Sequence, residues 1–319
     1  MGWWLIASLL VISLGWIRRK PAVTAPIFGG LLLSILLFTF FHPEQIPIGS
    51  SWVMRWAVIL SAASCMAYLE DLKVLRLAVL GCAWIQIAFM LLQAAGVETI
   101  FRVAGSGVAG TLAKRAALSI FLGFASMLCK GRCAWLFAGA SVVTGSLAGS
   151  VPAVAKLLFP LFMKARGMGI SAMAGAVLLL IPLGWDRLLL RLQAWSEGPS
   201  FLARGWLNGW GFYNLPGGFT DENMARSIHD PMSLMYSDYH STFVDYVARF
   251  GLPGLITLAA VMAWLFFRVR VGLELWLLGL AVWACAFQSA ESFPSMMMLG
   301  VFLFMHLVYK ERDSDVPPV

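Results

Sequence analysis

Charged residues are scarce in this chain, and their scarcity excludes an ordinary water-soluble protein. They make up 12% of the 319 residues, whereas hydrophobic residues make up 60% and the mean hydropathy is +0.82. Soluble domains carry about 25% charged residues. We therefore predict an integral membrane protein that has most of its mass in the bilayer and membrane lipids as its surroundings.

The chain also lacks the short patterns that mark several kinds of chemistry. Its five cysteines form neither a Cys-x-x-Cys pair nor a zinc-binding set. The carboxylates of the predicted outer side do not repeat at ligand spacing and include no Asp-x-Asp signature of metal-dependent sugar-nucleotide transferases. The Walker motif is missing, and no Gly-x-Gly-x-x-Gly run is followed by the acidic residue about 20 positions later that completes a dinucleotide-binding fingerprint. These absences predict no metal site, no disulfide, no cofactor and no ATP-driven function.

What the chain has instead is a series of long apolar stretches. A helix of about 20 apolar residues crosses a bilayer. The sequence therefore predicts an all-α polytopic membrane protein, a single transmembrane domain over residues 1–319 with about 11 transmembrane helices. The candidate spans are 2–17, 23–41, 51–69, 74–95, 109–128, 134–148, 150–163, 168–185, 240–267, 272–289 and 295–309.

The sixth and seventh candidate spans are short, and we expect them to form a helical hairpin broken at 149–152, where Gly and Pro occur. Lys156 would then lie within the seventh span. Because a lysine is costly at membrane depth, it indicates either a buried carboxylate partner or a misplaced span.

Basic clusters predict the orientation of the helices. With eleven spans the clusters between apolar stretches fall on one side, which the positive-inside rule makes cytoplasmic, with the N-terminus outside and the C-terminus inside. The net charge of +7 is explained in this way and indicates no nucleic-acid partner. The outer side receives the longest polar stretch, a loop at 186–239 that is rich in Trp, Tyr, Gly and charge. Loops of this length are usually functional, so we expect this one to carry part of a site.

His240 lies where this loop meets the ninth span. An imidazole gains or loses a proton near neutral pH, so a histidine at a membrane–water boundary is a candidate general base. The Gly251-Leu252-Pro253-Gly254 segment predicts a break in the ninth helix, with a short outer helix that begins near His240. The alternative is a hydrogen-bonded interface residue, which is the commoner role of a histidine at the start of a span.

Several cations fall at the predicted outer face and suggest a phosphorylated ligand. Arginine holds phosphate through paired donors. The candidates for this role are Lys114, Arg115, Arg187, Arg191 and Arg204. Arg187 has an alternative role, because it could snorkel from the end of its span and pair with Asp186. Arg249 is expected to pair with Asp245 four residues earlier and is left out of the site.

The segment around His240 resembles a known family. His240-Ser241, nine further residues and then Gly251-Leu252-Pro253-Gly254 are similar to the H-[NSQ]-x9-G-x-x-[GTY] pattern of O-antigen ligases and their polymerase relatives. In that superfamily the pattern follows a large periplasmic loop, as it does here.

Three weaker elements occur in the family's order. The segment 191–195 resembles its Arg-x-x-x-Trp element, 208–212 its Gly-x-Gly element, and 110–115, with Lys114 and Arg115, a segment before a membrane helix. The chain departs from the family in three ways. It is short, it has eleven predicted spans where about twelve are usual, and residues 144–147 lack the arginine of a Ser-Arg-Gly-like element.

The resemblance implies a metal-independent, inverting glycosyltransferase in the bacterial inner membrane with its active site facing the periplasm. The donor would be a glycan on undecaprenyl pyrophosphate, and the acceptor a hydroxyl on lipid A–core, another glycan or a protein. His240 would be the base, and Arg191, with Arg187, Arg115, Arg204 and Lys114, would bind the pyrophosphate. The acceptor pocket is not coded by a motif, so an O-antigen polymerase and a pilin or protein ligase stay open.

Two further classes are weighed against the ligase. A transporter of an anionic lipid-linked substrate would suit the outer cations, but no inverted repeat is evident and the large loop is one-sided. A structural membrane subunit would leave the His240 pattern unexplained.

Overall fold

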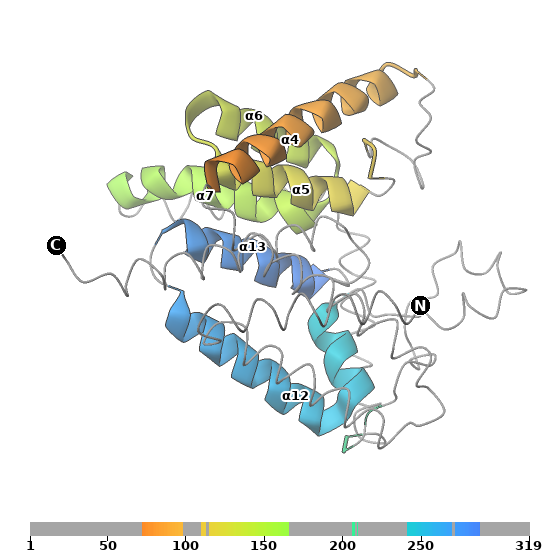
Figure 1. Ribbon diagram of the computed structural model, residues 1–319, viewed down its shortest axis with the longest axis vertical. Helices are drawn as coiled ribbons and strands as arrows, with labels where there is room; N and C mark the ends of the chain where they lie inside the picture. Colours follow the sequence, from red (N-terminus) through yellow and green to blue (C-terminus); the bar gives the residue numbers. More distant parts are fainter. Residues whose placement is uncertain are drawn as a thin grey trace, which may run out of the picture.

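The structure is a computed structural model, and it describes residues 72–97, 110–112, 115–165, 206–207, 209, 241–269 and 272–287. Every regular element in these ranges is an α-helix, and they contain no strand. The elements are α4 (Leu72–Ala94), α5 (Arg115–Leu128), α6 (Gly131–Val143), α7 (Leu147–Ala165), α12 (Thr242–Arg268) and α13 (Leu273–Phe287) (Figure 1). The all-α class is thus confirmed for this part of the chain. The candidate spans 2–17, 23–41, 51–69, 168–185 and 295–309, and the 186–239 loop apart from 206, 207 and 209, lie outside the described residues.

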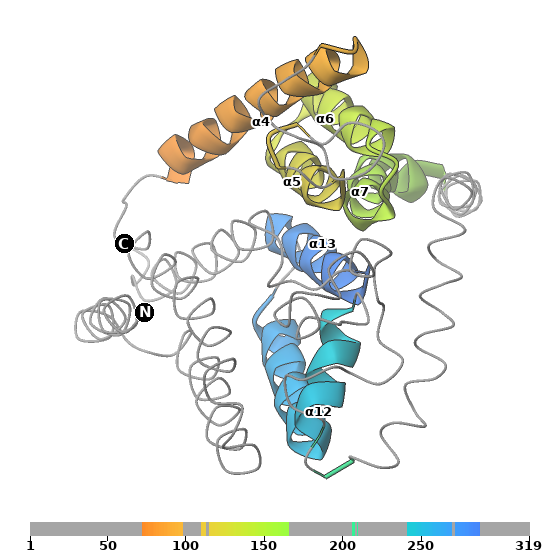
Figure 2. The same cartoon turned by 90° about the vertical axis from the view of Figure 1, so that its right-hand side faces the viewer.

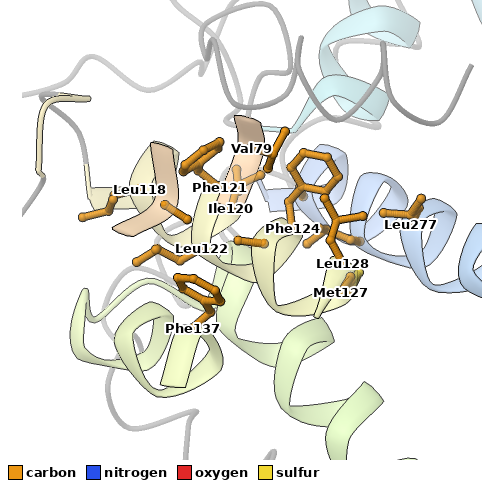
Figure 3. Close-up of a cluster of buried hydrophobic side chains, with 14 of the residues drawn as sticks. Val79, Leu118, Ile120, Phe121, Leu122, Phe124, Met127, Leu128, Phe137 and Leu277 are labelled. Atoms are coloured by element: carbon orange, nitrogen blue, oxygen red, sulfur yellow. The ribbon is translucent and has the colours of Figure 1, made fainter. Parts of the chain in front are cut away.

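Helix α5 is the centre of the described fold. Every residue from Ala117 to Leu128 is buried, and the helix contacts α4, α6, α7 and α13. Figure 3 shows Phe124 of α5 among side chains from its neighbours, with Val79, Phe137 and Leu277 coming from α4, α6 and α13. A helix that is apolar all round must be covered on all sides, and the sequence of α5 fits that place.

Two helices of the described part are long and apolar enough to cross a membrane, namely the segments Arg76–Ala94 of α4 and Thr242–Ala260 of α12. Large apolar side chains on both helices point away from the core, among them Leu77 (68% exposed) and Leu91 (66%) on α4 and Ile256 (59%) on α12. Broad exposed apolar faces mark protein or membrane contact, so these helices favour a membrane protein. The count of eleven spans stays a prediction.

The expected break at 149–152 is wrong, because α6 and α7 are joined earlier. The turn lies at 144–146, and Pro152 is inside α7. Gly145 takes a left-handed φ of 69°, and the Ser146 side chain accepts a hydrogen bond from the amide of Ala148 at 3.5 Å. Ser146 thus provides a side-chain acceptor at the start of α7. The predicted break rested on Gly149 and Pro152, whereas the Thr144 and Ser146 hydroxyls mark the actual turn.

Lys156 has a different role from the two that were expected. Its Nζ donates to the backbone carbonyls of Met127 (2.6 Å), Ser126 (3.2 Å) and Cys129 (3.5 Å). These oxygens belong to the last turn of α5 and the residue after it, where carbonyls lack helical partners and the helix dipole is negative. Lys156 therefore caps α5 from α7, and its acceptors are carbonyls of the main chain.

The expected break in the ninth span is confirmed in α12. Gly251 has φ 60° and ψ −144°, which interrupts the helix, and Figure 1 shows two limbs that meet at an angle there. The first limb begins at Thr242, after Ser241, whose side chain accepts a hydrogen bond from the amide of Val244 at 3.5 Å. Ser241 is thus the N-cap of the limb that follows His240 in the sequence.

Candidate functional site

The starts of α5, α7 and α12 and the end of α13 lie toward one end of the described fold, at the right of Figure 1. The start of α12 lies beside the C-terminal end of α13 in both views (Figures 1 and 2). The indole Nε1 of Trp283, in α13, donates to the carbonyl of Leu147 at the start of α7 at 3.0 Å. A side-chain contact joins the start of α5 to the turn before α7. The described helix ends that the predicted topology puts at the outer face therefore lie toward the same end of the fold.

Of the predicted site residues, the structure describes one, Arg115. It is the first residue of α5, and its side chain is partly exposed. The other five lie outside the described residues, namely His240, Arg191, Arg187, Arg204 and Lys114. Their roles, and the Asp245–Arg249 ion pair, stay predictions.

Arg115 reaches the turn between α6 and α7. Its Nη1 lies 4.0 Å from the position that a Cβ atom would take on Gly145. An added methyl group at 145 would touch the guanidinium at an ordinary contact distance, although the positive φ of Gly145 disfavours a side chain there. Residues 144–147 are the segment that was compared with the Ser-Arg-Gly-like element, and the Arg115 guanidinium lies beside Gly145 within it.

The turn that meets Arg115 is held to α5 by buried hydroxyls. Ser119 of α5 donates to the carbonyl of Ser146 at 2.8 Å and accepts from the amide of Gly149 at 3.2 Å. Ser141 of α6 donates to the carbonyl of Ser119 at 2.9 Å, and Thr144 donates to the carbonyl of Ser141 at 2.7 Å. Buried polar networks of this kind fix the position of the segment that they join, so the turn is a rigid support for a site.

Two glutamines of α4, which no sequence pattern had singled out, hold the segment before Arg115. The Gln86 amide donates to the Thr111 hydroxyl at 2.6 Å and accepts from the Thr111 amide at 2.8 Å. The Gln93 amide donates to the carbonyl of Gly110 and accepts from its N–H, both at 2.9 Å. The signal was present, because two glutamines seven residues apart lie on one face of an apolar helix, where polar side chains usually bond across helices.

We expect Gln86→Leu and Gln93→Leu to destabilise the protein and to weaken binding of a phosphorylated ligand. Each substitution leaves the main-chain groups of Thr111 or Gly110 without their partner, which costs about 1–3 kcal/mol. Thermal unfolding and donor binding would be measured. Ala88→Leu is the control, since it adds the same side chain at an exposed position of the same helix. Melting temperatures equal to that of the control would contradict a stabilising role for the hydrogen bonds of Gln86 and Gln93.

Two elements that are distant in the sequence meet at the break in α12. The amide of Leu252 donates to the carbonyl of Trp206 at 2.6 Å, and Gly209 lies against the backbone of Arg249 and Phe250. Trp206 and Gly209, the first glycine of the Gly-x-Gly element, therefore lie against the Gly-x-x-Gly end of the His240 pattern. The sequence showed only their order along the chain.

No family model matches the chain, and no curated protein matches it. The resemblance thus stands on the residues quoted above, and the function that follows is a proposal.

Proposed function

We propose that the protein is a metal-independent glycosyltransferase of the O-antigen ligase type. It transfers a glycan from undecaprenyl pyrophosphate to an acceptor hydroxyl, with lipid A–core as the first candidate acceptor. The packing of Trp206, Leu207 and Gly209 on Gly251 carries the proposal, because Gly209 and Gly251 belong to two elements that the resemblance links only by their order. Arg115 adds support, since it is the first residue of α5, and α5 begins at the end of the fold where α12 begins.

The proposed setting is the bacterial inner membrane. The chain would be a multi-pass domain of about 11 transmembrane helices, with the 186–239 loop and the active site on the periplasmic face. The two apolar helices and their exposed apolar side chains support a membrane setting. A one-sided enzyme suits a site built at one end of the helices.

In the proposed reaction, His240 accepts the proton of the acceptor hydroxyl as its oxygen attacks the anomeric carbon. The bond from that carbon to the pyrophosphate oxygen breaks with inversion, and undecaprenyl pyrophosphate leaves with the electron pair. The cations stabilise the negative charge of the leaving group, and they are Arg191, Arg187, Arg115, Arg204 and Lys114. Charge stabilisation in the transition state is often the largest single contribution to catalysis.

The test is transfer by purified protein in detergent micelles that contain EDTA. Undecaprenyl-pyrophosphate glycan and lipid A–core are supplied, and the products are separated by gel electrophoresis and mass spectrometry. We expect glycosylated lipid A–core. A lengthened lipid-linked glycan or a modified pilin would assign a polymerase or a protein ligase. Movement of the donor across vesicles without transfer would contradict the enzyme and favour the transporter.

A further inference from the structure

Gly251 is at the centre of a close contact between the loop and α12. A Cβ atom added to Gly251 would lie 2.6 Å from the amide nitrogen of Gly209 and 2.8 Å from the carbonyl oxygen of Trp206. Real Cβ atoms essentially never approach other heavy atoms so closely, and both partners are main-chain atoms that cannot rotate away. Gly251 also has a φ of 60°, which residues with a side chain rarely adopt. Both reasons require glycine at this position.

Gly209 meets the same requirement from the other side. Its φ is 69°, and an added Cβ would overlap the carbonyl group of Arg249 and lie 2.6 Å from the amide nitrogen of Phe250. Each glycine therefore packs its Cα against the backbone around the other. The contact is reciprocal, so a side chain on either residue would separate the two segments.

A hydrogen bond completes the contact. A kink interrupts the regular helical ladder, and the groups that it frees need other partners. The amide of Leu252 takes the carbonyl of Trp206 as its acceptor, at 2.6 Å. The loop thus supplies an acceptor at the point where α12 is broken.

The two limbs of α12 also pack closely on each other. A Cβ on Gly254 would lie 2.7 Å from the Cβ of Phe250 and 2.9 Å from the carbonyl oxygen of Tyr246, both on the first limb. Within the second limb the Thr257 hydroxyl donates to the carbonyl of Pro253, four residues earlier, at 2.8 Å. The angle of the kink is therefore fixed from within α12 as well as from the loop.

We propose that Trp206, Leu207 and Gly209 form a permanent latch in the break of α12 and that Gly209 and Gly251 are positioning residues for the reaction. The latch sets the direction of the limb from Ser241 to Phe250, whose first residue follows His240 in the sequence. It stays closed throughout turnover. This inference rests on the proposed function where activity is concerned, whereas the contact itself can be tested without any substrate.

The direct test is a cross-link between the two hydrogen-bonded residues. Trp206→Cys and Leu252→Cys are combined in a protein whose native cysteines are replaced by alanine, namely Cys65, Cys82, Cys129, Cys133 and Cys285. A main-chain hydrogen bond brings the two Cα atoms into the range of about 4.4–6.8 Å that a disulfide needs. Copper phenanthroline oxidises the pair, and free thiols are counted from the mass shift with maleimide-polyethylene glycol.

We expect an intramolecular disulfide to form in most molecules and adding Gly209→Ala to lower its yield several-fold. A low yield in the parent pair, or an equal yield with Gly209→Ala, would overturn the latch. Neither result depends on a glycan substrate, so the cross-linking experiment would still be valid if the proposed function were wrong.

The activity arm decides whether the latch stays closed. We expect the oxidised and the reduced protein to transfer glycan at rates within about 3-fold of each other, a smaller difference than the roughly 100-fold that a misplaced site costs. Loss of transfer on oxidation, restored by a reductant, would mean that the segment must leave the break and would overturn a permanent latch.

The glycine arm tests positioning with matched controls. Gly209→Ala and Gly251→Ala should lower kcat about 100-fold, since small misplacements of catalytic groups have effects of that order, with a smaller change in the KM of the donor. Gly131→Ala is the control for backbone strain, because Gly131 also has a positive φ but open space around it. Gly279→Ala, in α13, is the control for a helical position with nothing close by. Wild-type kcat in Gly209→Ala protein would contradict positioning.

Discussion

Replacing His240 by alanine is expected to reduce glycan transfer by about 10²–10⁴-fold, the usual contribution of a general base. Binding of undecaprenyl-pyrophosphate glycan should stay near the wild-type level, because the base acts on the acceptor hydroxyl and the cations hold the donor. Transfer would be followed in single turnovers, and donor binding by titration in detergent. Ser241 caps the helix that follows through its own hydroxyl, so that helix keeps its N-cap when His240 is changed.

A second substitution separates a base from a hydrogen-bonded interface residue. His240→Gln keeps a side chain that donates and accepts hydrogen bonds but takes up no proton in the working pH range. A catalytic base predicts that the glutamine variant is as slow as the alanine variant. An interface role predicts that glutamine restores transfer. His306→Ala, at the predicted cytoplasmic end of the last span, is the matched control and should leave the rate unchanged.

Local sequence was enough to predict the break in α12 and insufficient for the α6–α7 turn. Gly251 and Pro253 interrupt a helix by their own backbone chemistry, so the break could be placed within a few residues. In the hairpin, Ser146 provides a side-chain acceptor at the start of a helix that then runs through Pro152. Both the Gly149–Pro152 segment and the Ser146 hydroxyl could mark the start of the helix, and α7 begins next to Ser146.

The contacts of the candidate site were less predictable, because they join segments that are distant in the sequence. The motif elements could be placed in order along the chain, but nothing in that order shows that Gly209 packs on Gly251. The bonds from Gln86 of α4 to Thr111 and the approach of Arg115 to Gly145 likewise join residues that are far apart in the sequence. Hydrophobic periodicity and helix propensity describe a single helix, whereas these contacts depend on how several helices and a loop pack together.

The crossing of α5 and α7 should be the part of the described fold that is most sensitive to a single methyl group. A Cβ on Gly149 would overlap the carbonyl group of Ser119, and a Cβ on Gly123 would lie 2.6 Å from the carbonyl oxygen of Gly149. Small residues let helix backbones approach closely, and membrane proteins often pack their helices in this way. Gly149→Ala must therefore move one helix against the other, because main-chain atoms occupy the space.

We expect Gly149→Ala to lower the free energy of unfolding by about 3 kcal/mol, the upper part of the range for overpacked cores. Gly139→Ala is the matched control, since Gly139 lies in the neighbouring helix α6 with nothing within 4 Å of an added Cβ. The control should gain up to about 1 kcal/mol from replacing a helical glycine. Thermal unfolding in detergent measures both, and equal melting temperatures would contradict the close crossing.

Ser119 binds the α6–α7 turn across this crossing, so Gly149→Ala should also displace the turn that Arg115 reaches. A variant that still folds should then bind the pyrophosphate donor more weakly than the control, which would connect the packing of these helices to the proposed site.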